Sequence, residues 1–560
     1  MEQPKLELRS VPVTPYPRHR LCAEYGTSRV ETLDARLGAV SGGDPGRGLE
    51  VWHVNSGNAG GVADAIRSWL AHTGALRSVR MRWFIYDVGS VAEITKKMHN
   101  IFIGRSEGEG GRFRLTDGDR AAFLEATRLN AQSLLRQVAS RAVPPPDVVF
   151  IHDPQPSALF WMLARDPEFS DAYRRYFSRT AVLWFAHIPF ADIQSTPESR
   201  EAWAFVREFI SGYDARIFQE NVERPQDIPG PILFNRNAVD PQSLLNVGLP
   251  RRFVEETFAA LRLPVDRPWV LQNGRFDPWK DPEGVCLAYR QAVIDWMRAP
   301  ASVRQREAPP RLLLAGPISH DDPETFATLR ALRATVSRVE RELQALDPRL
   351  DRNIHLRPLF PDAPPGGDHV RAFREVGVDP DLTLPRLTLA QADALAGSAV
   401  DPRGLTAVDA HCLTVNALQT GAAIIVVKSL AEGFGLAATG AKLHGKPLIC
   451  ANTGGLGPQV EHGVTGFKVG LHGRGPGERI EPSEVLAPAR ELIGSGPLTH
   501  RDLTVIETGC YLLELISKPE LRERVGRAAQ QDVREKYLTL DQLERMAGWI
   551  ATVRSGPRAD

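Results

Sequence analysis

Short apolar runs alternate with longer amphipathic stretches along most of the chain. In the first half, mainly apolar runs begin near residues 49, 81, 147, 181 and 215 and read LEVWHVNS, MRWFIYDVG, DVVFIHD, AVLWFAHI and ARIFQ. Between them lie stretches with helical spacing, such as AAFLEATRLNAQSLLRQVA at 121–139. Strands that alternate with helices in this way indicate an α/β domain, in which helices cover both faces of a parallel sheet.

The same alternation begins again after the segment LRLPVDRP at 261–268, with the runs WVLQNG, RLLLAG, NIHLRP, AIIVVKS and PLICAN. A chain of 560 residues is too long for one ordinary core, so two α/β domains are expected. Residues 541–553 again have helical spacing, with Asp541 as the expected N-cap. We therefore predict an N-terminal arm at 1–48, a first domain at 49–264, a second domain at 265–540, and a closing helix and tail at 541–560.

The overall composition narrows the classes of partner. Basic and acidic residues number 68 each, so the chain has no net field that would attract nucleic acid or an anionic membrane. None of the apolar runs is long enough to cross a bilayer, and no apolar segment follows a basic one at the N-terminus. The five cysteines lack the close pairs of a zinc site and the density of a disulfide scaffold. We therefore expect reduced thiols in a cytoplasmic protein.

Three glycine-rich or charged loops follow predicted strands. The first, at 57–61, contains Asn58, Gly60 and Gly61 and opens a helix, where free N–H groups favour a phosphate or a sugar oxygen. Many strand-to-helix turns use glycine only to turn, and both interpretations stay open. The second loop carries Arg275 and Lys280, two cations whose spacing suits a diphosphate, although they could instead pair with nearby aspartates. Its place at the carboxyl end of a strand favours binding.

The third loop, KSLAEGFGL at 428–436, lies between an apolar run and a short helical stretch. Lys428 and Glu432 flank the strand end, and the following glycines lead into a helix whose N-terminus offers oriented N–H groups to a phosphate. Chance could place any one of these residues here, but hardly the whole set. We interpret the loop as an anion-binding site.

Two further segments, His152-Asp153 and His187-Ile188-Pro189, end strands of the first domain. A histidine at a strand end is most often a packed, hydrogen-bonded residue, yet together with Asp153 these side chains are also suited to sugar hydroxyls. The Asp-x-Asp pairs at 117/119 and 379/381 lie in loops that make poor metal clamps, and no His/Cys cluster has ligand spacing. No metal site is predicted.

Taken in order, these motifs resemble the trehalose glycosyltransferring synthases of glycosyltransferase family 4. The resemblance covers roughly residues 50–470, through GGVAD, TKKMHN, HDPQP, RFDPWKDPEGV, VNALQ and KSLAEGFGL, and then GKPLI, NTGG and HGVTGF. The piece HIPF at 187–190 also resembles trehalose-6-phosphate synthase. The resemblance implies a GT-B fold: two Rossmann-like domains facing across a cleft, the donor held mainly by the second and the acceptor by the first. The final helix would cross back to the first domain.

The resemblance also implies a reaction. Such enzymes transfer glucose from a nucleoside diphosphate donor (UDP-, ADP- or GDP-glucose) to glucose or a related acceptor, retain the α configuration and need no obligatory metal. The leaving phosphate itself would act as the base. The partners would be small-molecule sugars, and a homodimer is left open.

Individual roles follow from the matching motifs. Arg275 and Lys280 would stabilise the diphosphate as its charge grows, Glu432 would hold donor-sugar hydroxyls, and His187 would lie near the transferred sugar. The expected donor-binding residues are Gly60, Gly61, Lys428, Gly433, Phe434, Gly435, Leu436 and Gly440. The expected acceptor-binding residues are Asp153, Asn58 and His99.

Gly440 departs from the pattern of the family, which has a glutamate here that binds the ribose hydroxyls of the nucleotide. Losing a charge-assisted hydrogen bond costs about 1.5–3 kcal/mol, roughly ten- to a hundred-fold in affinity. Two alternatives to the transferase therefore remain. One is a retaining trehalose phosphorylase, since inorganic phosphate needs no ribose ligand. The other is a non-catalytic sugar- or nucleotide-binding relative.

Overall fold

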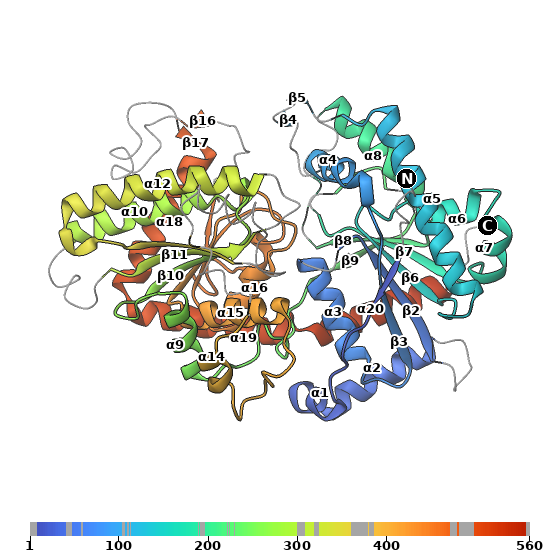
Figure 1. The fold of residues 1–560 in the computed structure, drawn as a ribbon, viewed down its shortest axis with the longest axis horizontal. Helices are drawn as coiled ribbons and strands as arrows, with labels where there is room; N and C mark the ends of the chain where they lie inside the picture. The colour runs from blue at the N-terminus through green and yellow to red at the C-terminus, as the bar shows by residue number, and fades with distance from the viewer. Residues whose placement is uncertain are drawn as a thin grey trace. The chain divides into compact units, whose positions relative to one another are not determined.

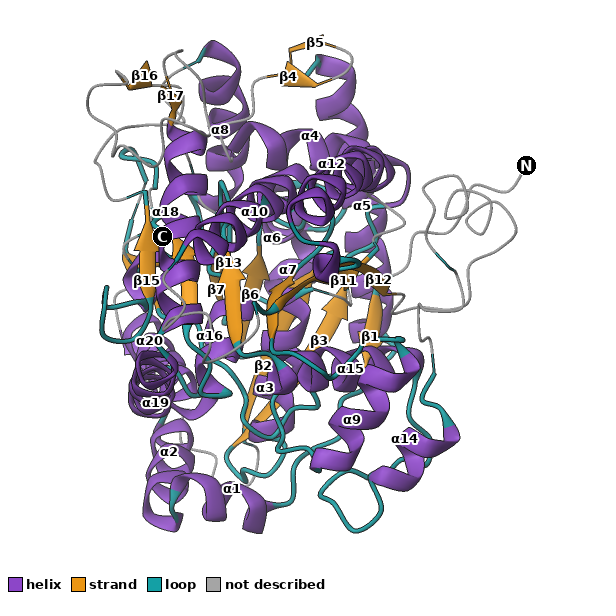
Figure 2. Ribbon diagram, turned by 90° about the vertical axis from the view of Figure 1, so that its left-hand side faces the viewer, coloured by secondary structure: helices purple, strands orange, loops and turns teal. Residues whose placement is uncertain are grey.

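The structure is a computed structural model. It describes the chain at 8–40, 48–57, 60–102, 107–108, 111–112, 114–188, 190, 196–220, 222, 224–228, 230–299, 309–318, 324–359, 379, 386–470, 479–480 and 498–555. The chain forms two compact units (Figure 1), the first made of 1–238 and 537–560 and the second of 239–536. Both contain a sheet with helices around it (Figure 2), which confirms the predicted α/β class.

The first unit is built on a seven-stranded sheet with the order β1-β3-β2-β6-β7-β8-β9. Its strands are β1 Arg9–Val11, β2 Leu49–Asn55, β3 Val79–Ile85, β6 Val148–His152, β7 Ala181–Phe185, β8 Ala215–Gln219 and β9 Ile232–Asn235. All neighbours pair in parallel except β1, which runs antiparallel to β3. Every residue of β2, β6, β7 and β8 is buried, which explains why these strands are mainly apolar in the sequence.

Nine helices accompany this sheet in the part of the unit that the structure describes. They are α1 Arg18–Tyr25, α2 Thr27–Ala39, α3 Gly61–Thr73, α4 Ala92–Phe102, α5 Asp117–Ala139, α6 Leu159–Arg165, α7 Ser170–Tyr176, α8 Pro197–Ile210 and α20 Thr539–Ser555. A 3₁₀ turn, Gly89–Val91, precedes α4. Two short strands, β4 Glu107–Gly108 and β5 Gly111–Arg112, pair with each other in antiparallel orientation. Helix α5 begins with a capping box in which Thr116 and Asp119 satisfy each other's backbone N–H groups.

Segments near both ends of the chain, β1 and α20, are packed into this unit. Residues 9–11 add the edge strand β1, and Arg29 of α2 forms ion pairs with Asp541 and Glu544 of α20. Apolar side chains of α20, among them Leu543 and Met546, belong to the same buried cluster as the central strands. The closing helix therefore returns to the first unit.

The second unit is built on a six-stranded parallel sheet with the order β12-β11-β10-β13-β14-β15. Its strands are β10 Trp269–Asn273, β11 Arg311–Pro317, β12 Ile354–Leu359, β13 Ile424–Val427, β14 Leu448–Ala451 and β15 Phe467–Val469. The described helices are α9 Arg251–Ala260, α10 Pro282–Arg298, α12 Glu324–Leu346, α14 Leu389–Ala394, α15 Ala407–Gly421, α16 Leu436–Leu443, α18 His500–Ser517 and α19 Pro519–Lys536. Shorter elements are the 3₁₀ turns Pro278–Lys280, Pro348–Leu350 and Gly457–Gln459, and the paired strands β16 Arg479–Ile480 and β17 Leu498–Thr499.

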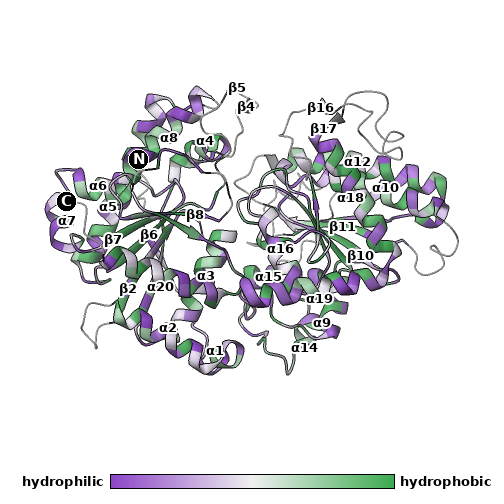
Figure 3. Cartoon of the chain, turned by 180° about the vertical axis from the view of Figure 1, so that it is seen from behind, coloured by the Kyte–Doolittle hydropathy of each residue, from purple (hydrophilic) through white to green (hydrophobic). Residues whose placement is uncertain are grey.

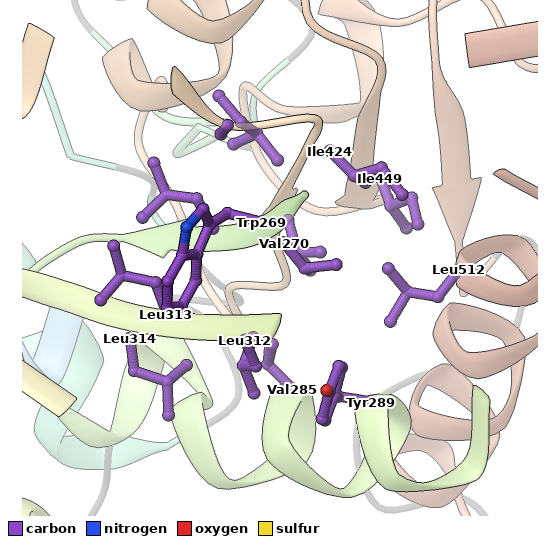
Figure 4. Close-up of a cluster of buried hydrophobic side chains, with 14 of the residues drawn as sticks. Trp269, Val270, Val285, Tyr289, Leu312, Leu313, Leu314, Ile424, Ile449 and Leu512 are labelled. Carbon is purple, nitrogen blue, oxygen red and sulfur yellow. The ribbon is translucent and has the colours of Figure 1, made fainter. Parts of the chain in front are cut away.

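The core of the second unit joins the sheet to α10 and α18. Trp269, Val270, Leu312 and Tyr289 lie in one buried cluster (Figure 4), and the Tyr289 hydroxyl donates a hydrogen bond of 2.7 Å to the carbonyl of Pro310. The central strands of both units are coloured as hydrophobic in Figure 3, as expected of strands buried on both faces.

The unit boundaries differ from the predicted domain limits at 264/265 and 540/541. Residues 239–264, which include α9, belong to the second unit, where Phe258 of α9 packs on Trp269 at a ring distance of 6.2 Å. The segment LRLPVDRP at 261–268 directly precedes β10, the first strand of that sheet along the chain. It does not mark the point at which the chain passes between units.

Candidate functional site

In each sheet, successive strands are added first on one side and then on the other, so the strand order reverses at one point. In the second unit, β10, β11 and β12 extend to one side and β13, β14 and β15 to the other, so the change falls between β10 and β13. In the first unit it falls between β2 and β6. Open α/β sheets bind ligands outside the carboxyl ends of the strands at such a switch point. All three loops singled out in the sequence follow one of these strands.

In the second unit, the switch point brings Lys280 and Glu432 together. Lys280 follows β10 and Glu432 follows β13, and the Lys280 ammonium forms an ion pair with the Glu432 carboxylate. Ser429 donates to the same carboxylate oxygen at 3.1 Å. The two side chains are 21% and 15% exposed, so this pair is partly open to solvent and can exchange its partner for a ligand. Two predicted site residues, 152 positions apart, thus meet.

Arg275 lies on the same loop and is more accessible. Its side chain is 51% exposed and lies 3.4 Å from the carboxylate of Asp277, which is 5% exposed. Asp277 also caps the turn Pro278–Lys280 by accepting from the Lys280 backbone N–H at 3.1 Å. Gln272 donates to the Lys280 carbonyl at 2.6 Å. The loop therefore carries one exposed guanidinium, that of Arg275, and one partly buried ammonium, that of Lys280.

Lys428 is placed differently from the donor-binding role that the resemblance implies. Its side chain is 1% exposed, and its ammonium forms an ion pair with the equally buried Asp281. Burial lowers the pKa of Lys428, and Asp281 opposes that shift. Arg501 of α18 donates to Asp281 as well, at 2.8 and 2.6 Å. In this geometry Lys428 ties the end of β13 to the start of α10 and does not reach solvent.

Asp281 itself adopts the left-handed conformation, with φ 45°. Its carboxylate accepts from the N–H of Gly284 at 3.1 Å and so caps α10. A side chain at Gly284 would collide with that carboxylate. The Asp281 network thus joins the end of the Arg275–Lys280 loop to β13, α10 and α18.

The loop 433–435 reaches the start of α16. Gly435 is the N-cap with φ 86°, a conformation that favours glycine, and a Cβ there would run into Leu456. Gly433, Phe434 and Leu436 complete the loop and the first helical position. The turn Asn452–Gly455 closes on it: the Gly455 N–H donates to the Glu432 carbonyl at 3.2 Å. A Cβ at Gly454 would collide with that same carbonyl oxygen.

Gly440 lies in the middle of α16 and is buried. A Cβ added there would lie 3.1 Å from Oε1 of Gln419 and 3.5 Å from Oδ1 of Asn246. Gln419 belongs to α15 and is 4% exposed. Two amide side chains therefore face the space in which the side chain of the family glutamate would begin.

In the first unit, the neighbouring strands β6 and β7 end side by side and bring Asp153 next to His187. The Asp153 carboxylate accepts from the backbone N–H of His187 at 2.7 Å, and its carbonyl accepts from the indole of Trp184 at 2.9 Å. Asp153 has φ 63°, a left-handed conformation that is uncommon outside glycine. Burial raises the pKa of Asp153 to about 7, opposed by the backbone hydrogen bonds.

Three histidines form a row across neighbouring strands of this sheet. His53 Nδ1 lies 3.0 Å from His152 Nε2, and His152 Nδ1 lies 2.8 Å from His187 Nε2. Burial lowers the pKa of His53 and of His187 to about 3, and that of His152 well below its ordinary value. All three imidazoles are therefore neutral at physiological pH.

The remaining predicted residues of the first unit are distributed around β2 and β3. Gly60 is the N-cap of α3 with φ 89°, and Gly61 is its first residue. His99 lies in the last turn of α4 and is half-buried. Asn58 lies outside the described residues.

Several residues that complete the site were not predicted as site residues from the sequence: Ser429, Asp281, Arg501, Gln419, Asn246 and His53. Ser429 lies within the quoted motif and could have been included. The others depend on which strands and helices are neighbours. Among the described residues no group of three or more His, Cys, Asp or Glu side chains has the arrangement of a metal site. None of the described helices combines the length and apolarity needed to span a membrane.

Comparison with known proteins agrees with this architecture. The family described as "Trehalose synthase, N-terminal domain" matches residues 53–223, and "Glycosyl transferases group 1" matches 414–470. The trehalose synthase of Rubrobacter xylanophilus is 26% identical over 527 residues, 93% of this chain and 94% of that protein. That of Pyrococcus furiosus is 26% identical over 500 residues, 88% of each chain.

Solved structures share the fold. An alpha,alpha-trehalose-phosphate synthase (UDP-forming) from Burkholderia xenovorans, in complex with glucose-6-phosphate, superposes with a TM-score of 0.56 at 13% identity, covering 91% of this chain and 100% of that one. An E. coli structure described as trehalose-6-phosphate bound with UDP-2-fluoro glucose gives a TM-score of 0.55 at 12% identity, covering 91% and 99%.

The fold, the two switch-point sites and these matches define the class. The chain is a glycosyltransferase with the GT-B fold, an enzyme that acts on sugars. Within that class it is similar to the trehalose synthases, through the N-terminal domain match at 53–223 and the curated relatives at 26% identity.

Proposed function

We propose that the protein is a retaining glucosyltransferase that moves glucose from a nucleoside diphosphate glucose to glucose or a closely related acceptor, forming trehalose or a similar α-linked product. The observation that carries this proposal is the Lys280–Glu432 pair at the switch point of the second sheet, beside Arg275 and the N-terminus of α16. A cation, an exposed guanidinium and a helix start together suit a diphosphate.

In this proposal the second unit holds the donor. The bond between the anomeric carbon and the β-phosphate oxygen breaks, and negative charge develops on the diphosphate. Arg275 and Lys280 stabilise that charge, and preorganised charge of this kind is usually the largest catalytic term. Glu432 exchanges Lys280 for donor-sugar hydroxyls, while Gly433, Phe434, Gly435 and Leu436 let the backbone approach.

The acceptor hydroxyl forms the new bond on the same face of the sugar, and its proton passes to the leaving phosphate. No protein nucleophile is needed for this route. His187 supplies a neutral polar contact to the transferred sugar, Asp153 and His99 contact acceptor hydroxyls, and Gly60 and Gly61 open the backbone of the first unit. Asn58 stays a prediction, as do the cytoplasmic location and a homodimer.

Lys428 enters the proposal in a changed role. Its ammonium is paired with Asp281 and 1% exposed, so it supports the Arg275–Lys280 loop and does not touch the donor. This differs from the donor contact that the family resemblance implies.

Gly440 bears on the two alternatives. The space beside it is faced by Oε1 of Gln419 and Oδ1 of Asn246, and amide oxygens can accept hydrogen bonds from ribose hydroxyls. We infer that the nucleoside is held by amide hydrogen bonds in place of a carboxylate. This supports a transferase over a phosphorylase or a non-catalytic relative, because polar groups still face the ribose position.

The test is product formation by the purified full chain. We expect an α,α-linked disaccharide when the protein receives glucose with at least one of UDP-, ADP- and GDP-glucose, with the anomeric configuration read by proton NMR. Arg349 is an exposed cation of the same unit that pairs with the nearby Asp347, and Arg349→Gln should behave as wild type. Absence of product with all three donors would refute the transferase, and phosphate-dependent cleavage of trehalose would replace it with the phosphorylase.

A further inference from the structure

The imidazole row of the first unit has a defined direction. His53 lies within β2, His152 is the last residue of β6, and His187 follows β7. These three strands are consecutive neighbours in the sheet, so the row runs from the interior of the sheet to its carboxyl edge. His53 and His152 are both 0% exposed. At the outer end, His187 is half-buried.

Aromatic rings enclose the row and hold its planes. His53 stacks on Phe150 with ring centroids 5.0 Å apart, and Trp69 of α3 lies 5.2 Å from His53 and 5.9 Å from His152. Phe185 stacks on His187 at 4.1 Å. The rings can therefore neither rotate freely nor exchange partners without disturbing the core.

Only two proton arrangements suit three neutral imidazoles joined by two N···N contacts. Each neutral ring carries one proton, and each contact needs one donor and one acceptor. In the first arrangement His53 and His152 donate through Nδ1, which leaves the third proton on His187 Nδ1. In the second, every contact is reversed and the third proton lies on His53 Nε2.

The inner end of the row distinguishes the two arrangements. His53 Nε2 is buried and has no hydrogen-bond partner among the described residues. The first arrangement leaves a bare lone pair there, whereas the second leaves an unpaired buried N–H. Orphaned buried N–H groups are rarer than unpaired acceptors, and an unsatisfied buried donor disfavours its tautomer by roughly 5- to 150-fold.

We propose that His53 and His152 are positioning residues that lock His187 as the Nδ1–H tautomer. His187 then presents an N–H donor, not an acceptor, to an oxygen atom of the sugar substrate, a contact that rests on the proposed function. At its inner end the row stops at His53 Nε2, which is buried and has no hydrogen-bond partner among the described residues. It sets the hydrogen-bonding character of His187 from two strands away.

The tautomers can be read directly. In long-range ¹H–¹⁵N correlation spectra of the full chain labelled with ¹⁵N-histidine, we expect the His187 ring in the Nδ1–H form, with its signals assigned by their loss in His187→Asn. Finding His187 as Nε2–H in the wild-type protein would overturn the proposal. This measurement needs no substrate, so it stands whether or not the proposed reaction is observed.

Substitutions at His53 test the direction of control. His53→Asn keeps a donor near the Nδ1 position and should preserve the His187 tautomer, whereas His53→Phe removes it and should let the Nε2–H form of His187 appear. His72→Phe is the matched control, because His72 is a buried imidazole of the same unit, 1% exposed and outside the row. Its replacement should leave the His187 spectrum unchanged.

Kinetics test the consequence for the substrate. If the transferase is confirmed, His53→Phe should lower kcat about ten-fold, as expected for one misdirected hydrogen bond, while His53→Asn stays within about two-fold of wild type. A changed tautomer with unchanged kcat and KM would overturn the substrate contact. An unchanged tautomer in His53→Phe would overturn the positioning role.

Discussion

Replacing Lys280 tests whether the ion pair at the second switch point is catalytic or merely structural. In the free protein its ammonium is paired with Glu432, which also accepts from Ser429 at 3.1 Å. Lys280→Gln keeps an N–H donor of similar reach but removes the charge. If Lys280 stabilises the charge that grows on the leaving diphosphate, the substitution should lower kcat by about 100- to 1000-fold, the effect typical of removing one preorganised donor.

The effect on stability should be small by comparison. The pair is partly exposed, at 21% and 15%, and pairs of this kind contribute at most about 1 kcal/mol. Ser429 remains to satisfy Glu432. We therefore expect the midpoint of urea unfolding to change little while the rate falls steeply. A structural pair would show the opposite pattern, in which stability falls and the rate constant of the folded enzyme persists.

The assay is release of nucleoside diphosphate under saturating donor and acceptor, beside a urea unfolding curve of the same preparation. Glu432→Gln and the double variant complete a cycle: because both residues act on one bound donor, their effects on kcat should be far from additive. Arg349→Gln controls for the loss of a cation elsewhere in the unit. A folded Lys280→Gln enzyme with wild-type kcat and KM would refute this reasoning.

Three further predictions concern binding and stability. The double variant Gly440→Glu with Gln419→Ala should bind nucleoside diphosphate about ten-fold more tightly than the wild-type protein. Gly440→Glu alone should gain less, because its new Cβ would lie 3.1 Å from Gln419 Oε1. Equal calorimetric affinities of the two variants would contradict this prediction. Lys428→Met should lower the free energy of unfolding by about 3 kcal/mol, since it leaves the buried carboxylate of Asp281 with one cation fewer, and an unchanged urea midpoint would refute it. Burial lowers the pKa of His53 to about 3 in the folded protein, whereas in the unfolded chain it is about 6.5. As the pH falls below about 6.5, the unfolded state takes up a proton that the folded state does not, and the free energy of unfolding falls by about 2 kcal/mol at pH 5. Asp153, whose pKa is raised to about 7, acts in the opposite direction. The comparison of His53→Phe with wild type isolates the histidine term: the variant should lose less stability between pH 7 and pH 5.

The strands and the glycine turns were predictable because their causes are local. A strand such as β7, buried along its whole length, must be apolar on both faces, and it therefore appears in the sequence as the unbroken run AVLWF. Gly435 and Gly454 have positive φ and lie where a Cβ would collide, so their residue type is also set by local geometry. The Arg275–Lys280 loop was predictable for a related reason, since charged residues after a parallel strand lie at the binding edge.

The boundary between the units and the role of Lys428 could not be predicted in this way. Helix α9 precedes the first strand of the second sheet and has an amphipathic pattern that would suit either sheet. Its long-range packing assigns it to the second unit, through Phe258 on Trp269 and Phe253 in a cluster with Leu413. Lys428 is a cation next to a glycine-rich loop, which is typical of a phosphate site. Its partner Asp281 lies 147 residues away, and no local sequence pattern predicts that these two residues pair.

The histidine row shows most clearly what strand order adds to sequence. His152 lies 99 residues from His53 and 35 from His187, and each by itself has the character of an ordinary packed histidine. The sheet order β2-β6-β7 makes them neighbours. Because each neutral ring carries one proton, the three histidines then have only two possible hydrogen-bonding arrangements. His187 was identified from the motif HIPF and its position after a strand, but which of its nitrogens carries the proton is decided by His53 Nε2, a buried atom on another strand. The chemistry of a predicted site residue is therefore set by a residue that gives no functional signal of its own.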